Sequence, residues 1–137
     1  MKTILVLCTG NSTRSQMAHG YLQHFAGDRA EVLSAGVETH GLNPKAVQVM
    51  AEDGIDISHH TSNHVDEYRE RNIDFVITVC DNASERCPVW IGRTHQTHYN
   101  FEDPSKATGT PEAIMETYRR SCDQIKSFSR DFVEQHV

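Results

Sequence analysis

A cysteine followed by a short polar loop joins a hydrophobic strand to a helix near the N-terminus. The apolar run at residues 4–7 predicts a buried strand, and apolar residues recur at helical spacing over residues 17–25. Cys8, Gly10 and Arg14 lie between these two elements. In a strand–loop–helix unit of this kind, the N–H groups of the loop point inward and the start of the helix adds partial positive charge. The segment therefore predicts a binding site for an oxyanion.

The residue types in this loop suit nucleophilic chemistry on a tetrahedral oxyanion. Arg14 offers a planar fork of donors that matches such an anion. The positive field of the loop also favours the thiolate of Cys8, which is the nucleophilic form. The alternative is a buried structural cysteine beside an arginine that caps the helix, but this leaves a polar loop after an apolar strand unexplained. The predicted oxyanion-binding residues are Thr9, Gly10, Asn11, Ser12, Thr13, Arg14 and Ser15.

The composition restricts the class of protein. The chain has 137 residues, which suits one domain over 1–137, and its formal net charge of −6 argues against a general nucleic-acid binder. The N-terminus carries no signal-peptide pattern, and no apolar run approaches membrane-spanning length. We therefore expect a cytoplasmic protein that binds neither nucleic acid nor a membrane. In a reducing compartment, the four cysteines are expected to be catalytic, redox-active or metal-binding rather than structural disulfides.

Strand and helix patterns alternate along the chain. The sequence predicts strands at 3–8, 32–35, 74–79 and 94–98, and helices at 13–26, 44–53, 64–71 and 110–135. Asn43 and Thr110 are each followed by proline, which is typical of a helix start. This alternation predicts an α/β fold with a parallel sheet of about four strands and helices on both faces.

In such folds the functional site lies beyond the carboxyl ends of the strands. Cys8 and Cys80 each follow a predicted strand, so the same edge of the sheet should bring them close together. Asp103, in a polar loop and followed by Pro104, is a candidate general acid. Asp-Pro is also common in ordinary turns, which is the alternative for this pair.

Cys80 and Cys87 form a second constellation. On a regular helix their Cα atoms would lie about 10 Å apart, whereas bonded cysteines need about 7 Å or less. A disulfide between them therefore requires the segment to unwind or loop, so the oxidised and reduced forms would differ in shape. The alternatives are two unrelated thiols, or a zinc site with His95 and His98, although this spacing fits no usual zinc pattern.

The remaining histidines and cysteine have simpler interpretations. His59, His60 and His64 could indicate a metal site, but polar surface residues ahead of a short helix explain them better. Cys122 lies on the apolar face of the predicted C-terminal helix, where a packed core thiol is expected.

With these residues considered, the chain resembles the thioredoxin-coupled arsenate reductases, a family built on the low-molecular-weight protein tyrosine phosphatase fold. The resemblance extends from residue 4 to about residue 129. Its motifs are CTGNS at 8–12, RSQMA at 14–18, SAG at 34–36, GIDIS at 54–58, VITVCD at 76–81, CP at 87–88 and FEDP at 101–104.

The resemblance implies a role for each residue of the loop chemistry. Cys8 would attack arsenate, which the loop and Arg14 hold, and Asp103 would protonate the leaving oxygen. Ser15 would support the Cys8 thiolate by a hydrogen bond. We expect a monomeric enzyme of arsenical detoxification with no tightly bound cofactor.

The resemblance also implies a relay of three cysteines. Cys80 would attack Cys8, which releases arsenite and leaves a Cys8–Cys80 disulfide. Cys87 would then attack Cys80, and reduced thioredoxin would reopen the resulting Cys80–Cys87 disulfide.

Two residues depart from the family pattern. His19 stands where many members carry Glu, and Asn63 stands where some carry Asp. Together with Asn11 and Ser34, these positions resemble a potassium site found in some members. Replacing two carboxylates removes the charge that a hard cation prefers, so we do not expect potassium here and assign no metal site.

Two rival functions remain. A phosphotyrosine phosphatase would need only Cys8, Arg14 and Asp103 and would leave the other two relay cysteines idle. In this chain, however, Asp103-Pro104 is followed by Ser105-Lys106 rather than the aromatic pair of such phosphatases. The other rival is a non-enzymatic module that senses an anion or the redox state.

Overall fold

Four parallel strands form one sheet at the centre of the molecule. The computed structural model describes residues 1–80, 89–92 and 94–137. The strands are β1 (Lys2–Cys8), β2 (Ala30–Gly36), β3 (Phe75–Thr78) and β4 (His95–His98), in the order β2-β1-β3-β4. Every neighbouring pair is parallel, which confirms the predicted α/β class and the parallel sheet.

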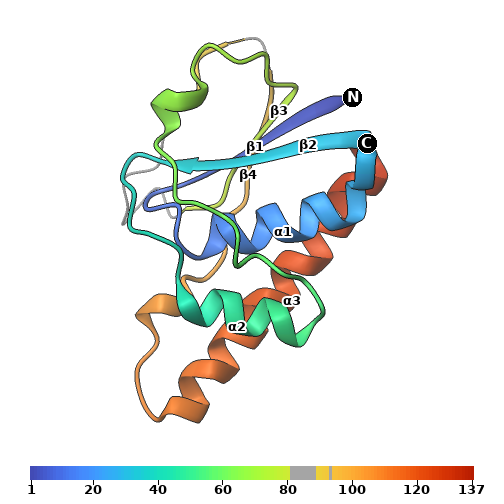
Figure 1. The fold of residues 1–137 in the computed structure, drawn as a ribbon. Coiled ribbons are helices and arrows are strands. Elements are labelled where there is room, and N and C mark those ends of the chain that lie inside the picture. The colour runs from blue at the N-terminus through green and yellow to red at the C-terminus, as the bar shows by residue number, and fades with distance from the viewer. Residues whose placement is uncertain (81–88, 93) are drawn as a thin grey trace.

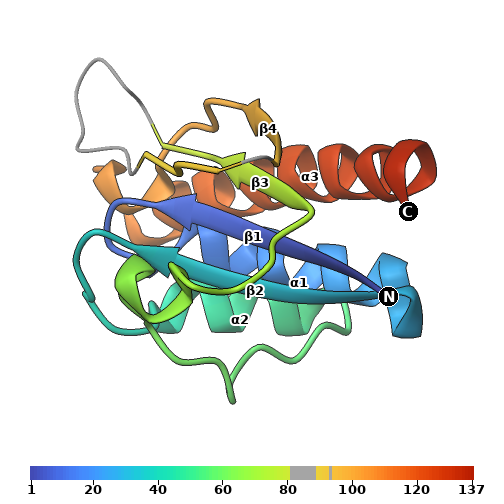
Figure 2. The same cartoon turned by 90° about the horizontal axis from the view of Figure 1, so that it is seen from above.

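The three α-helices all pack on one face of this sheet (Figures 1 and 2). They are α1 (Arg14–Ala26), α2 (Pro44–Glu52) and α3 (Pro111–His136). Single-turn 3-10 helices are η1 (Gly27–Arg29), η2 (Val65–Tyr68) and η3 (Pro104–Lys106). The opposite face of the sheet is covered by η2 and by neighbouring loop residues such as Ile73 and Trp90. The sequence predicted helices on both faces of the sheet. In the structure, the three α-helices cover one face, and only the short η2 and loop residues cover the other.

The central strand β1 is buried on both faces because its side chains alternate between two hydrophobic clusters. Ile4 and Val6 pack toward the three helices, whereas Leu5 and Leu7 pack toward η2 and Trp90. All four side chains have no exposed surface. Continuous burial of this kind explains why the strand reads as an unbroken apolar run.

The predicted helix starts are confirmed, and one predicted helix is shorter than expected. Asn43 and Thr110 cap α2 and α3 by accepting hydrogen bonds from the N–H groups of Lys45 and Ala113. The helix expected at 64–71 is reduced to η2, where a reciprocal cap at His64 closes one turn. Only Val65 of this turn is buried, so no apolar face extends the helix. Within the described residues, no helix combines the length and hydrophobicity needed to cross a membrane.

The carboxyl ends of β1 and β3 meet at one edge of the sheet. Leu7 is in register with Thr78, and the N–H of Val79 donates to the carbonyl of Leu7 at 2.9 Å. Cys8 and Cys80, the residues that follow, are both buried at this edge, with 4% and 0% exposure. The topology thus places the first two predicted relay cysteines at the same edge, as expected.

Candidate active site

The loop between β1 and α1 turns its carbonyl groups outward. Backbone N–H groups from segment 38–43 donate to the carbonyls of Thr9, Gly10 and Ser12 at 3.0–3.2 Å. The Gln16 side chain donates to the carbonyl of Asn11 at 3.1 Å. Because each peptide unit carries its N–H opposite its C=O, the N–H groups of residues 10–13 face the concave side. This arrangement has the geometry that an anion cradle requires, and the binding of an oxyanion there stays a prediction.

Asn11 shapes the loop from within. It has a φ of 48°, a left-handed conformation that Asn tolerates better than most residues. Its side chain is fully buried, donates to Ser15 Oγ at 2.8 Å and accepts from the N–H of Asn63 at 2.7 Å. Since Ser15 Oγ accepts from Asn11, the hydroxyl proton of Ser15 is directed elsewhere. The hydrogen bond expected from the Ser15 hydroxyl to the Cys8 thiolate stays a prediction.

Strand β2 runs close against the loop because residue 36 has no side chain. A Cβ at Gly36 would lie 2.5 Å from the carbonyl oxygen of Thr9 and 2.9 Å from the N atom of Asn11. Both neighbours are backbone atoms, which cannot turn aside. Any larger residue here would therefore displace the oxyanion loop.

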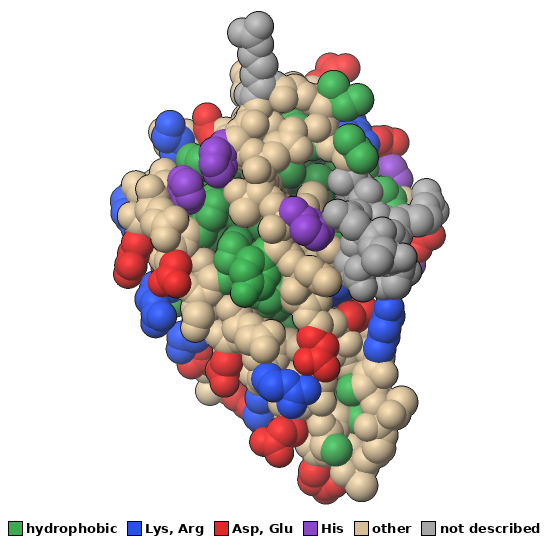
Figure 3. Space-filling view, turned by 180° about the vertical axis from the view of Figure 1, so that it is seen from behind, with side chains coloured by type: hydrophobic (Ala, Val, Ile, Leu, Met, Phe, Trp, Pro, Cys, Tyr) green, Lys and Arg blue, Asp and Glu red, His purple; other side chains and the backbone are tan. Residues whose placement is uncertain are grey.

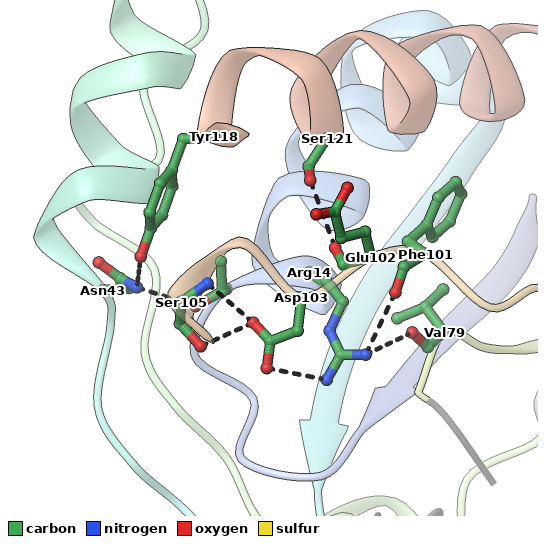
Figure 4. A network of polar contacts seen from close by, with 10 residues as sticks. Arg14, Asn43, Val79, Phe101, Glu102, Asp103, Ser105, Tyr118 and Ser121 are labelled. Atoms are coloured by element: carbon green, nitrogen blue, oxygen red, sulfur yellow. Dashed lines mark hydrogen bonds and ion pairs between the residues drawn. The ribbon is translucent and has the colours of Figure 1, made fainter. Parts of the chain in front are cut away.

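Arg14 lies at the start of α1 (Figure 4). Only 3% of its surface is exposed. Its Nη1 donates to the carbonyls of Val79 and Phe101 at 3.3 and 3.4 Å. Its Nη2 pairs with Asp103 Oδ2 at 3.5 Å. Contacts to two separate segments, at residue 79 and at residues 101–103, hold the guanidinium in place, as bidentate recognition of an oxyanion requires.

Asp103 acts as the cap of η3 and faces Arg14 at the same time. Its Oδ1 accepts from the N–H and the hydroxyl of Ser105 at 3.0 and 2.6 Å, and its side chain is 16% exposed. The two interpretations of Asp103-Pro104 are thus compatible. The turn orients one carboxylate oxygen and leaves the other at the predicted site (Figure 4).

One cavity of about 460 Å³ collects most of the predicted residues. Its described lining is Cys8, Thr9, Gly10, Ser12, Thr13, Arg14, Glu38, His40, Asn43, Asp103, Ser105 and Lys106. Asn11 and Ser15 stand behind the loop rather than in this lining. A larger cavity of about 560 Å³ lies between β4 and α3 on the face shown in Figure 3, where hydrophobic side chains are exposed, and it carries none of the predicted catalytic residues.

The cysteines fall into different states. Cys80 is disulfide-bonded, whereas Cys8 and Cys122 keep their thiols. Cys80 is therefore not bonded to Cys8 in this structure. Cys87, its predicted partner, lies outside the described residues.

Cys122 is a core thiol, as expected. It lies 3.1 Å from the Tyr21 hydroxyl and 3.7 Å from Met50 Sδ. Burial raises the pKa of the Cys122 thiol, which disfavours the reactive thiolate.

The alternative zinc site is not assembled by the residues that the structure describes. Cys80 is in a disulfide and cannot offer a thiolate, and His98 Nδ1 is bonded to Thr78 Oγ1 at 2.7 Å. His95 packs edge-on against Phe75. The fourth proposed ligand, Cys87, lies outside the described residues.

The four positions that resemble a potassium site do come together, but through direct protein contacts. His19 Nδ1 lies 2.9 Å from Ser34 Oγ, and the ring of His19 stacks on His60 with centroids 4.2 Å apart. Burial, and then the neighbouring His60 and His59, lower the pKa of His19 to about 3. The imidazole is therefore neutral at ordinary pH.

The outer support of the loop could not be predicted from the sequence. Asn43 was recognised only as a helix cap, yet its Nδ2 also donates to Thr13 Oγ1 and to the Tyr118 hydroxyl, both at 2.9 Å. Glu38 and His40 line the cavity and were not singled out. No local pattern marks these residues, because their contacts join distant parts of the chain.

Comparison with known proteins agrees with this geometry. Residues 3–136 match the family described as low molecular weight phosphotyrosine protein phosphatase. Over 133 residues, the arsenate reductases of Bacillus subtilis (strain 168) and Bacillus licheniformis are 44% and 47% identical, covering 97% of this chain and 96% of each relative. A solved structure, described as an arsenate reductase in the phosphate binding state, matches with a TM-score of 0.86 at 28% identity and covers 100% of both chains. This chain belongs to the low molecular weight phosphotyrosine protein phosphatase family, and within it to the group of the arsenate reductases.

Proposed function

We propose that this enzyme reduces arsenate to arsenite with Cys8 as the nucleophile and Cys80 and Cys87 as the relay. The position of the Cys8 thiol is the main support for this proposal. It shares one cavity with Arg14 and Asp103, at the sheet edge where Cys80 is already held in a disulfide. The curated relatives named above carry the same activity in their names.

The first step forms a bond between sulfur and arsenic. The inward N–H groups of the loop and the Arg14 guanidinium bind the oxygens of arsenate and stabilise the charge that develops on them. The Cys8 thiolate attacks arsenic opposite the leaving oxygen. Asp103 donates a proton to that oxygen, which departs as water.

The second step reduces arsenic. The Cys80 thiolate attacks Cys8 Sγ, the sulfur–arsenic bond breaks, and its electron pair goes to arsenic, which leaves as arsenite. Two thiolates are thereby oxidised to the Cys8–Cys80 disulfide. Cys87 then attacks Cys80 and Cys8 departs as a thiolate. A structure with Cys80 in a disulfide and a thiol at Cys8 supports this order, because it matches the end of the relay.

The proposed reductant is thioredoxin, a protein dithiol that returns two electrons to the relay. Such a cycle runs in a reducing compartment such as the cytoplasm. We also propose a monomer as the active unit.

Coupled turnover tests the proposal. The protein is mixed with arsenate, thioredoxin, thioredoxin reductase and NADPH, and both NADPH consumption and arsenite are measured. A parallel reaction contains glutathione and glutaredoxin. We expect turnover with thioredoxin, its loss in Cys80→Ser, and normal rates in the matched control Cys122→Ser. Release of phosphate from phosphate esters without arsenite formation would instead support the phosphatase alternative.

We also propose that the enzyme needs no potassium. Ser34 Oγ is already engaged by His19, and the Asn11 amide oxygen by the N–H of Asn63, so the side chains that could bind a cation have protein partners. Equal rates in potassium and sodium chloride are expected for the wild type. In His19→Glu, which supplies a carboxylate, the rate should respond to potassium. A wild-type rate that depends on potassium would contradict this proposal.

A further inference from the structure

The rim of the oxyanion cavity is polar throughout the part that the structure describes. Beyond the loop, Arg14 and Asp103, the lining consists of Glu38, His40, Asn43, Ser105 and Lys106. None of these is Phe, Tyr or Trp, and none is aliphatic. The rim therefore offers hydrogen-bonding groups and charges to the part of a bound anion that extends beyond the loop.

His40 is held in this rim by three separate contacts. Its Nε2 lies 2.6 Å from Glu38 Oε2, and its backbone N–H donates to the carbonyl of Gly10 at 3.0 Å. The edge of the ring covers the loop, since a Cβ at Gly10 would lie 2.3 Å from His40 Nδ1. The contact with Glu38 holds the imidazole at the mouth of the cavity, where the side chains of His40 and Glu38 are 56% and 42% exposed to water.

This rim treats two kinds of anion differently. When the loop binds the oxygens of an anion, the remaining substituent faces the rim, opposite Cys8. An inorganic oxyanion presents another oxygen there, which hydrogen-bonds to polar groups and to water. The aryl group of a phosphate ester would have to cover the His40–Glu38 pair, and stripping water from a polar pair is unfavourable when no new partner replaces it.

We propose that His40, held by Glu38, is a specificity-determining residue that restricts the cavity to inorganic oxyanions and rejects aryl phosphates. The inference rests on the proposed function, because it defines the substrate class of the same cavity. It also explains how a chain with a phosphatase-type loop avoids competing esters.

Calorimetric titration of the purified protein with inorganic phosphate and with phenyl phosphate tests this inference without any turnover. In the wild type, phenyl phosphate should bind at least about tenfold more weakly than phosphate. His40→Phe keeps a flat ring but removes its polarity and its bond to Glu38. Contact between two aromatic rings contributes roughly the free energy of a tenfold change in Kd. The ratio of the Kd for phenyl phosphate to the Kd for phosphate should therefore fall by about tenfold in this variant.

Two further variants make the outcome decisive. His24→Phe adds the same ring at an exposed position on α1 and should leave the ratio of the two affinities unchanged. Glu38→Gln removes the charge of the Glu38 side chain with little change in its shape. It should lower the ratio of the two Kd values severalfold. This variant tests the inference on its own if His40→Phe does not fold. Equal binding of both ligands by the wild type, or an unchanged ratio in both rim variants, would overturn the inference. If the protein discriminates between phosphate and phenyl phosphate as expected but forms no arsenite, the proposed function is wrong and the inference about His40 stands.

Discussion

Acid should destabilise this protein through His19, and the size of the effect follows from its surroundings. Burial, followed by the nearby His60 and His59, lowers the pKa of His19 from 6.5 to about 3. Below pH 6.5 the unfolded chain binds a proton at this residue while the folded protein does not. Stability therefore falls as the pH drops, by about 1.4 kcal/mol for each pH unit. Near pH 5 the accumulated loss from His19 is about 2 kcal/mol.

Urea unfolding followed by far-ultraviolet circular dichroism near pH 7 and near pH 5 measures this loss. His19→Gln cannot take up the proton, so its stability should fall by about 2 kcal/mol less than that of the wild type over the same interval. His24→Gln is the matched control, because His24 is exposed on the same helix. All proteins should share one redox state. If His19→Gln and the wild type lose equal stability, the neutral, buried imidazole is not the cause and the reasoning fails.

Three predictions concern the reaction itself. Arg14→Lys should lower kcat/KM for arsenate about a hundredfold in the coupled assay, because a point charge cannot form paired hydrogen bonds to an oxyanion; an unchanged value would remove Arg14 from the binding role. Asp103→Asn should lower kcat about a hundredfold with little change in KM, since the amide keeps the shape but not the acid. Wild-type kinetics of the first Cys8 adduct in this variant would refute the acid role. Cys87→Ser should yield about one arsenite per enzyme and then stop, while Cys122→Ser cycles normally. Repeated turnover by Cys87→Ser at the wild-type rate would argue against the relay.

The sequence was sufficient for the parts of the site that follow from local pattern and sheet topology. An apolar run, a cysteine and a helix start predicted the loop between β1 and α1, and parallel strands require their carboxyl ends to share an edge. That edge explains why Cys8 and Cys80 were expected together. The ion pair of Arg14 with Asp103 was not predicted, because the two residues are far apart in the chain and no local pattern connects them.

The parts that could not be predicted depend on contacts between distant segments. Asn43 supports Thr13 and Tyr118 as well as its own helix, which no periodicity reveals. His60 looked like a surface residue, yet it stacks on His19 and bonds to Gln16 at 3.0 Å. Tertiary packing also decided the short η2, where a polar sequence with good capping residues gave one turn rather than a helix.

The outward-turned carbonyls of the loop have a consequence for protein synthesis. The groups that hold them come from residues well downstream, in segment 38–43 and at Ser62, whose hydroxyl donates to the carbonyl of Gly10. A nascent chain that has only just emerged from the ribosome carries Cys8 without this support for the loop around it. The loop takes its folded shape only when these later segments have emerged and docked. Translation thus delays assembly of the loop until the segments up to Ser62 have emerged.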